Sequence, residues 1–147
     1  MVARVTIALA GLDFERFTIY SSKHHLYQPS CGAVFVPDVS VVKDKPEIVE
    51  VEEEILMTTN PRMVIEVLSD TTRAYDLGIK LPRYRQIESM RHILYVEQDR
   101  PMMTLHTRIE GTDRWRSEDY DHEHSSLLIG DQVIDVAAVY RQVYRQS

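Results

Sequence analysis

The sequence predicts an α/β (more narrowly α+β) domain. A helix is followed by three strands, a second helix and a further strand, and then by a β-rich C-terminal extension and a final helix. Three observations lead to this prediction. Apolar residues recur with a helical period near the start of the chain, β-branched apolar runs cover 34–42 and 62–68, and helix-initiating residues follow the second run. The 147 residues suffice for one domain with its own core, so 1–147 is expected to be a single domain.

The first elements are predicted from short-range periodicity. Apolar residues form a broad stripe on a helix over 2–14. Residues 17–27 alternate between apolar and polar side chains, which is typical of a strand, and the turn residues of 29–32 end it.

The next two strands surround an irregular, acidic segment. Residues 34–42 are apolar and β-branched, and Pro37 within them indicates a sheet edge or a bulge. Residues 43–61 have no clear period, and a break at Asn60-Pro61 ends them. Residues 62–68 form a continuous apolar run that favours a buried strand.

A long helix is expected after the buried strand. The Ser and Thr residues of 69–72 favour a helix start, and the helix should run to about Ser89. Pro82 would kink it unless the regular helix begins only near Lys80. The rest of the chain is predicted to contain strands over 92–97, 102–109 and 115–122, a β-turn-β unit over 127–133 and a helix over 136–144.

Charge and cysteine content narrow the function classes. The net charge of −6 argues mildly against a nucleic-acid partner, although much of it comes from glutamates within 47–54, and 73–91 is basic. No apolar stretch is long enough to span a bilayer, and no secretory signal is expected at the start. Cys31 is the only cysteine, so it forms no internal disulfide. A cytoplasmic protein without a membrane partner is expected.

Two carboxylates and a lysine suggest a chemical site. Glu66 lies within an apolar run, where a carboxylate is costly to bury without a partner. Asp38 follows Pro37 in the other β-branched run, and Lys80 lies four residues after Asp76 on the expected helix. If the two strands were neighbours, the acids and the lysine would share a site. Carboxylates that hold Mg²⁺ and a lysine that stabilises phosphoryl charge are what a metal-dependent phosphodiesterase needs.

Four segments carry a family resemblance. They are the Pro-Asp strand within 35–42, the Glu-Val-Leu-Ser stretch of 64–73, the Asp-to-Lys-to-Tyr helix of 76–84 and the strand 91–96. Together they resemble the Uma-two family of small bacterial endonucleases, within the restriction-endonuclease-like superfamily that has the PD-(D/E)xK signature. The match runs from about Ile7 to about Tyr140. It implies a restriction-endonuclease-like domain with a mixed central sheet flanked by helices.

The resemblance also implies roles for individual residues. Asp38 and Glu66 would bind Mg²⁺ (or Mn²⁺), with the Val67 carbonyl as a third oxygen donor. Lys80 would orient or activate the attacking water, so the catalytic set is Asp38, Glu66 and Lys80. Ser69, Asp76 and Tyr84 would support the site.

The chain departs from the family pattern in two ways. The superfamily lysine lies two residues after the second acid, where this chain has Leu68. The resemblance implies that Lys80 replaces it from the following helix. Relatives usually carry a further N-terminal segment before the first helix, which this chain is expected to lack.

Each site residue also has a plain structural interpretation. Asp38 would be a turn or edge residue, and Glu66 would form a salt bridge to Lys80 or Arg83. Asp76 and Lys80 would form a surface pair one helical turn apart, worth ~0.3–0.5 kcal/mol. Tyr84 would be a packing residue, and Ser69 would cap the helix. His122 and His124 would share one side of a strand as a possible metal pair, although no third ligand is evident.

Three functions remain open at this level. The favoured one is a Mg²⁺-dependent DNA endonuclease. The others are a catalytically weak or inactive relative that acts as a DNA-binding or oligomerisation module, and a metal hydrolase of small phosphoesters. A homodimer is expected because apolar side chains occur throughout the tail, at Met102, Leu105, Tyr120, Leu127 and Leu128.

Overall fold

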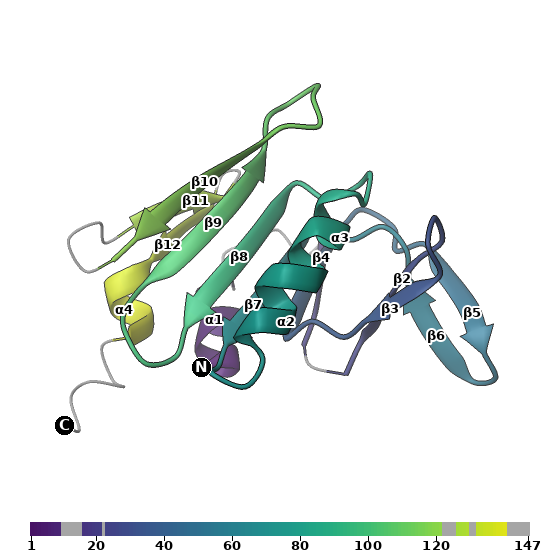
Figure 1. Cartoon of the computed structure of the whole chain (residues 1–147), viewed down its shortest axis with the longest axis horizontal. Helices are drawn as coiled ribbons and strands as arrows, with labels where there is room; N and C mark the ends of the chain where they lie inside the picture. The colour runs from purple at the N-terminus through teal and green to yellow at the C-terminus, as the bar shows by residue number, and fades with distance from the viewer. Residues whose placement is uncertain (10–15, 22, 122–125, 130–131, 141–147) are drawn as a thin grey trace.

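A six-stranded mixed sheet forms the centre of the protein. The computed structural model describes residues 1–9, 16–21, 23–121, 126–129 and 132–140. The strand order is β1-β4-β7-β8-β9-β10 (Figure 1). Only β7 and β8 are parallel, and the other neighbours are antiparallel. The strands are β1 Phe17–Tyr20, β4 Val39–Lys43, β7 Met63–Leu68, β8 His92–Glu97, β9 Met103–Arg108 and β10 Trp115–Tyr120. The predicted mixed central sheet is confirmed.

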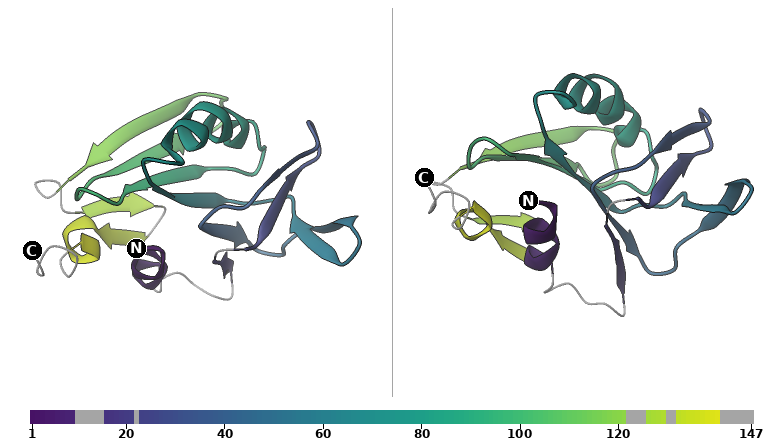
Figure 2. Two further views of the ribbon diagram at one scale, coloured as in Figure 1. Left: turned by 60° about the horizontal axis from the view of Figure 1, so that its bottom comes forward. Right: turned by 90° about the horizontal axis from the view of Figure 1, so that it is seen from below.

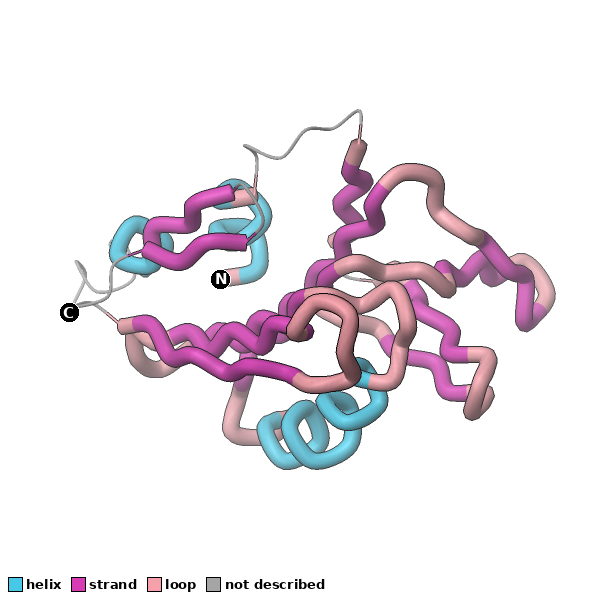
Figure 3. The backbone as a smooth tube through the Cα atoms, turned by 90° about the horizontal axis from the view of Figure 1, so that it is seen from above, coloured by secondary structure: helices cyan, strands magenta, loops and turns pink. Residues whose placement is uncertain are grey.

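Helices cover both faces of this sheet, as Figures 2 and 3 show. One face carries a continuous helical segment made of α2 Arg73–Tyr75, η1 Asp76–Lys80 and α3 Leu81–Arg85. The other face carries the short helices α1 Val2–Ala8 and α4 Val136–Tyr140 and a hairpin of β11 Ser126–Ile129 and β12 Gln132–Asp135. No helix among the described residues is long and apolar enough to cross a bilayer.

Strand β7 divides its side chains between two cores. Met63 and Ile65 face α1 and α4, whereas Val64 and Leu68 pack with residues of α3. Successive strand side chains point to opposite faces, so Glu66 lies on the α3 side with its two even-numbered neighbours. The apolar run around Glu66 is therefore buried on both faces, as predicted.

A second, four-stranded sheet extends from the side of the domain. Its order is β3-β2-β6-β5, with β2 His25–Gln28, β3 Ala33–Phe35, β5 Ile48–Glu52 and β6 Ile55–Thr58. The β5–β6 hairpin lies in the segment that was expected to be irregular. Glu54 takes a positive φ of 68° at its turn, a conformation that glycine or asparagine usually provides. The sequence therefore lacks the usual turn signal.

Two of the expected strands are each divided between the sheets. The run 17–27 forms β1 and β2, and Lys23, with φ 84°, interrupts the extended backbone between them. The run 34–42 forms β3 and β4, separated by Val36, Pro37 and Asp38. Because Pro37 has no N–H to give to a ladder, the chain changes sheet there.

The long helix is shorter than expected and contains a π-helical turn. Regular helix begins at Arg73, and η1 precedes α3, where Pro82 lies in the first turn. The Leu81 N–H bonds to the Asp76 carbonyl five residues back. Because Pro82 donates no hydrogen bond, the wider turn joins two helical segments without a kinked α-helix. Neither alternative describes the segment fully, because α-helix begins at Arg73, well before Lys80, and starts again at Leu81 after the π-helical turn.

Candidate functional site

The site is built around the Glu66 carboxylate, which is 3% exposed on the α3 face of β7. Glu66 Oε1 lies 3.2 Å from Lys80 Nζ and accepts a 2.8 Å hydrogen bond from the Tyr84 hydroxyl. Tyr84 is completely buried and Lys80 is 7% exposed. A buried carboxylate is thus paired with a charge and a hydroxyl, which offsets much of its desolvation cost.

Asp76 joins the same cluster from the π-helical turn. Its Oδ1 lies 3.5 Å from Lys80 Nζ, and the side chain is 4% exposed. The Tyr95 hydroxyl donates a 2.8 Å hydrogen bond to the Asp76 backbone carbonyl, which fixes the turn against β8. The Asp76–Lys80 pair is buried rather than a surface pair, so the solvated interpretation of these two residues is wrong.

Asp38 approaches the site from the neighbouring strand. It directly precedes β4, which pairs with β7 so that Val39 is opposite Ile65, and the next pair along would be Asp38 and Glu66. Asp38 Oδ2 accepts a 2.7 Å hydrogen bond from the Val67 N–H. The carboxylate therefore extends the β4–β7 ladder by one bond and is held beside the strand that carries Glu66.

The electrostatic balance leaves Glu66 with a raised pKa of about 7. Burial is the largest cause, and the nearby charges of Asp76 and Asp38 raise the pKa further. Lys80 and the Tyr84 hydroxyl act in the opposite direction. The pKa of the Tyr84 phenol is also raised, by burial first and then by Glu66, so this hydroxyl remains a donor.

The donor atoms near Glu66 are of the kind that Mg²⁺ prefers. Asp38, Glu66 and the Val67 carbonyl are hard oxygen ligands. The N–H and C=O of a residue in an antiparallel ladder point to the same side, so the Val67 carbonyl points toward the side where Asp38 lies. Within the described residues, no three His, Cys, Asp or Glu side chains are grouped closely enough to hold a metal. A ligand set at this place would therefore have to be drawn from two carboxylates and a backbone carbonyl.

The remaining predicted residues lie at or outside the edge of the site. Ser69 follows β7, and its hydroxyl lies within hydrogen-bonding distance of the Thr71 and Thr72 hydroxyls. It does not cap the helix, because Thr72 occupies the N-cap position. His122 and His124 lie outside the described residues.

Glu97 is a buried acid that the sequence patterns did not single out. It ends β8 opposite Leu68, is 4% exposed, and pairs with Arg73 and, at 3.8 Å, with Arg100. The sequence feature that could have indicated its burial is its position at the end of the apolar segment that forms β8. The Arg73 contact ties the start of α2 to the sheet and so fixes the helix that carries Lys80.

Comparison with known proteins identifies the family. The family described as "Uma2: Putative restriction endonuclease" matches residues 7–138. The chain belongs to this family. The Uma2 match covers both acids, the lysine and most of the described core, and it confirms the resemblance found in the motifs.

Two individual proteins are also similar to this Uma2 chain. A crystal structure from Anabaena variabilis, described as "a putative nuclease belonging to DUF820", superposes with a TM-score of 0.69 at 12% sequence identity, covering 95% of this chain and 75% of that one. This likeness supports the restriction-endonuclease-like fold. A Synechocystis protein named "Uncharacterized protein sll1609" is 28% identical over 84 residues, which are 57% of this chain and 46% of that protein. The chain thus matches less than half the length of this curated relative.

Proposed function

We propose that this Uma2 protein is a Mg²⁺- or Mn²⁺-dependent endonuclease that hydrolyses phosphodiester bonds in DNA, in the cytoplasm. The observation that carries the proposal is the buried Glu66 carboxylate paired with Lys80, with Asp38 anchored on the adjacent strand. A structural ion pair alone would not require the second acid beside it. Family membership supports a nuclease, and the donor set supports a divalent cation.

Asp38 and Glu66 would be the metal ligands, together with the Val67 carbonyl. Among the described contacts, the hydrogen bonds of each carboxylate use one oxygen, Oδ2 of Asp38 and Oε1 of Glu66. The second oxygen of each acid is the one available to a ligand. The cation, when bound, supplies Lewis-acid polarisation of the phosphodiester and lowers the pKa of a coordinated water.

Lys80 would stabilise the negative charge that grows on the phosphate oxygens during attack by water. Asp76 holds the ammonium group in place one helical turn away, so Lys80 keeps a partner when Glu66 turns toward a ligand. The Tyr84 hydroxyl fixes Oε1 of Glu66 and so orients its second oxygen. Ser69, at the end of β7, would face the substrate side of the site.

The second candidate is a catalytically weak or inactive member that uses the fold to bind DNA or to oligomerise. One observation favours it: the Lys80 and Tyr84 contacts already satisfy Oε1 of Glu66. With its raised pKa, Glu66 is partly protonated near neutral pH unless a cation is bound. The Glu66–Lys80 pair would then be retained as a stabilising contact in a protein that had lost its activity.

DNA cleavage separates the two candidates. Plasmid and single-stranded DNA would be incubated at low salt with Mg²⁺, Mn²⁺, Ca²⁺ or chelator. The endonuclease should cut with Mg²⁺ or Mn²⁺, cut poorly with Ca²⁺, and stop in chelator, because Ca²⁺ accepts looser oxygen geometry. Glu66→Gln should abolish both cleavage and metal binding. Lys80→Ala should lower turnover by a factor on the order of 10² while retaining metal binding, because it acts on transition-state charge.

Matched controls come from exposed residues of the same types. Glu53→Gln and Lys45→Ala change the same charges far from the site and should cleave like wild type. Equal residual cleavage in all five proteins would indicate a contaminant. Absence of cleavage combined with retained DNA binding would favour the module.

A further inference from the structure

A groove rich in arginine lies at the opposite end of the sheet from the Asp38–Glu66–Lys80 site. Two adjoining cavities of about 1000 and 510 Å³ form it, and both are lined by Arg62 and Arg91. Arg62 directly precedes β7, four residues before Glu66. At ~3.3 Å per strand residue, the two positions are roughly 13 Å apart. We call this surface the arginine groove, defined by Arg62, Arg85, Arg91 and Arg108.

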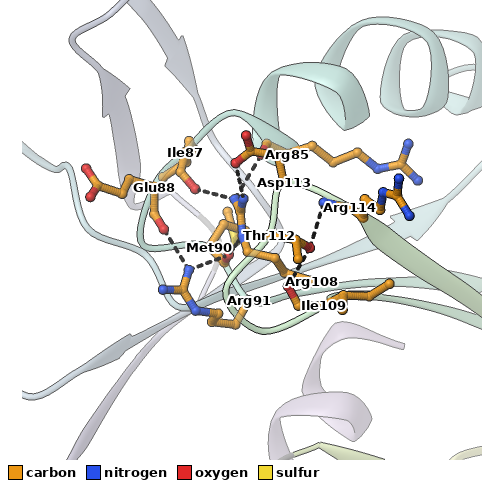
Figure 4. Close-up of polar contacts among 10 residues, drawn as sticks. All are labelled: Arg85, Ile87, Glu88, Met90, Arg91, Arg108, Ile109, Thr112, Asp113 and Arg114. Atoms are coloured by element: carbon orange, nitrogen blue, oxygen red, sulfur yellow. Dashed lines mark hydrogen bonds and ion pairs between the residues drawn. The ribbon is translucent and has the colours of Figure 1, made fainter.

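Arg108 builds the wall of the groove rather than its binding surface. Its guanidinium donates hydrogen bonds of 2.9 Å to the backbone carbonyls of Arg85, Ile87 and Met90, which lie at and beyond the end of α3 (Figure 4). It also lies over the Trp115 ring, 4.7 Å from the centroid. These contacts use its donors and fix the segment between α3 and β8.

Arg62 and Arg91 have more guanidinium N–H groups free of protein acceptors than Arg108 has. Arg91 donates through one nitrogen, Nη1, to the Glu88 and Met90 carbonyls, and no side-chain hydrogen bond of Arg62 is found among the described residues. The two residues are neighbours at the starts of β7 and β8, where the Arg91 N–H donates a 2.8 Å hydrogen bond to the Arg62 carbonyl, and Arg91 acts on Arg62 as a like charge. The pKa of Arg62 is lowered by burial and then by Arg91, with Asp44 opposing, and the pKa of Arg108 is lowered by burial and Arg91, with Asp113 opposing.

The groove is lined by as many basic as acidic side chains, because Lys43 lies in it beside the four arginines. The five acids that line it are all exposed: Asp44, Glu47, Glu88, Glu110 and Asp113. The nearest described ion pair, Arg108 to Asp113, is 3.7 Å long and its carboxylate is fully solvated, so it contributes little. In Figure 4 the Glu88 carboxylate points away from the Arg91 and Arg108 guanidiniums. Arg85 Nε and Trp115 Nε1 are buried without an acceptor among the described residues, so they lie beneath the groove surface and are not open to a ligand.

We propose that Arg62 and Arg91 form a phosphate-binding site, separate from the acid–lysine site, for a ligand that carries two or more phosphate groups. A guanidinium is planar and presents paired N–H donors that match phosphate oxygens, and two such groups side by side suit adjacent phosphates. The two cavities, of about 1000 and 510 Å³, each have room for more than one phosphate group. Its ligand is therefore a nucleic-acid backbone or a small polyphosphate compound, which share this chemistry.

Trp115 provides a direct probe, because it is the only tryptophan in the chain and lines the larger cavity. Pyrophosphate would be titrated into the full chain in chelator, and tryptophan fluorescence and heat would be recorded. Saturable binding is expected. The titration is repeated with Glu66→Gln, which should bind pyrophosphate as tightly as wild type. Pyrophosphate binding therefore tests the groove independently of the proposed endonuclease activity. No saturable change in either signal would overturn the site.

Variants that remove or keep the charge test the two arginines. Arg62→Gln and Arg91→Gln should each weaken pyrophosphate binding at least tenfold, and Arg62→Lys should lose less than Arg62→Gln. Arg100→Gln is the control, since Arg100 lies at the other end of β8 and its side chain is 60% exposed. Wild-type affinity in both glutamine variants would overturn the proposal, as would equally tight binding of citrate. If Arg62→Gln fails to fold by circular dichroism, Arg91→Gln decides the outcome.

A competition arm identifies the source of the phosphate. A DNA oligonucleotide that displaces pyrophosphate, with an affinity that falls steeply with salt, would assign the groove to a nucleic-acid backbone. An oligonucleotide that fails to compete while pyrophosphate binds would assign it to a small polyphosphate compound. Both results support the phosphate site.

Discussion

At the scale of single residues, Glu66 is held between opposing forces. Burial and two neighbouring acids favour its protonated form, whereas Lys80 and the Tyr84 hydroxyl favour its charged form. The raised pKa of about 7 indicates that burial dominates in the metal-free protein. A bound cation would reverse this balance, because positive charge favours the carboxylate.

The first prediction concerns the pH dependence of stability in chelator. The Glu66 pKa rises from 4.5 to about 7 on folding, so between these values the folded state holds a proton that the unfolded state has lost. Stability contributed by Glu66 therefore falls as pH rises through this window, by roughly 3 kcal/mol in total. The free energy of unfolding of wild type minus that of Glu66→Gln should decrease by about this amount between pH 4.5 and 7.5.

The comparison with Glu66→Gln isolates this group from the histidines. Burial, and then nearby arginines, lower the pKa values of His92 and His106 to about 4, so their contributions rise with pH between 4 and 6.5, in the opposite direction. Both histidines are present in wild type and in Glu66→Gln. Their contributions therefore cancel when one free energy of unfolding is subtracted from the other. A difference that is flat with pH would show that folding does not raise the pKa of Glu66.

The second prediction concerns Asp38 without metal. Asp38→Asn keeps an oxygen acceptor for the Val67 N–H and removes repulsion with Glu66, so stability should change by less than ~1 kcal/mol or increase. Asp38→Ala removes the acceptor and should cost ~1–2 kcal/mol. Chemical denaturation in chelator measures both. A large loss in Asp38→Asn alone would mean that the negative charge itself holds the strand end.

At the scale of secondary-structure elements, the π-helical turn sets the direction of Lys80. Asp76–Lys80 lies between two short helical segments, and its ends carry the two charged groups that face Glu66. A wider turn shifts the residues after it around the helix axis. The register of Lys80 and Tyr84 against β7 therefore depends on this turn.

The third prediction tests the backbone of this turn. Gly78 lies in η1 outside the left-handed region, is exposed, and a Cβ added there would contact nothing within 4 Å. Gly78→Ala should therefore stabilise the protein by ~0.5–1 kcal/mol, through lower entropy of the unfolded chain. Gly32→Ala, at φ +68°, is the opposite control and should destabilise it. Thermal melting measures both, and a lower Tm for Gly78→Ala would contradict the prediction.

At the scale of the whole molecule, only some of the apolar tail residues that were expected to form a dimer interface lie on the surface. Of the five tail residues that suggested a homodimer, Leu105 and Leu127 are buried, and Leu128 is 61% exposed. Leu128 lies opposite Val133 in the β11–β12 hairpin, and Val133 is 59% exposed. Among the described residues after β8, these two large apolar side chains are the most exposed.

The fourth prediction is therefore a homodimer that uses the outer face of this hairpin. Light scattering should give the mass of a dimer for wild type and of a monomer for Leu128→Lys, because a buried lysine is costly at an apolar interface. Leu56→Lys, at an exposed apolar position of the β5–β6 hairpin, is the matched control and should remain dimeric. A monomeric wild type at high concentration would contradict the prediction.

Local patterns were sufficient for the sheet and the acids. Apolar period and β-branching placed β7, β8 and β9, β10 was predicted as a polar strand, and the apolar neighbours of Glu66 predicted its burial. Local patterns failed where one apolar segment contributes strands to both sheets, as on either side of Pro37. The residues that move the chain from one sheet to another resemble those that form a turn within a single sheet. The β5–β6 hairpin was missed because Glu54 takes a turn conformation that its residue type does not signal.

The sequence by itself determined that Glu66 would be buried and that Asp76 and Lys80 would share one helix face, because both follow from spacing along a single element. Only the tertiary structure decided that Lys80 and Tyr84 reach Glu66 and that Asp38 binds the Val67 N–H. The arginine groove likewise unites the ends of separate strands. Contacts between elements depend on sheet order and helix register, which arise from packing of the whole chain and leave no periodic signal within any one segment.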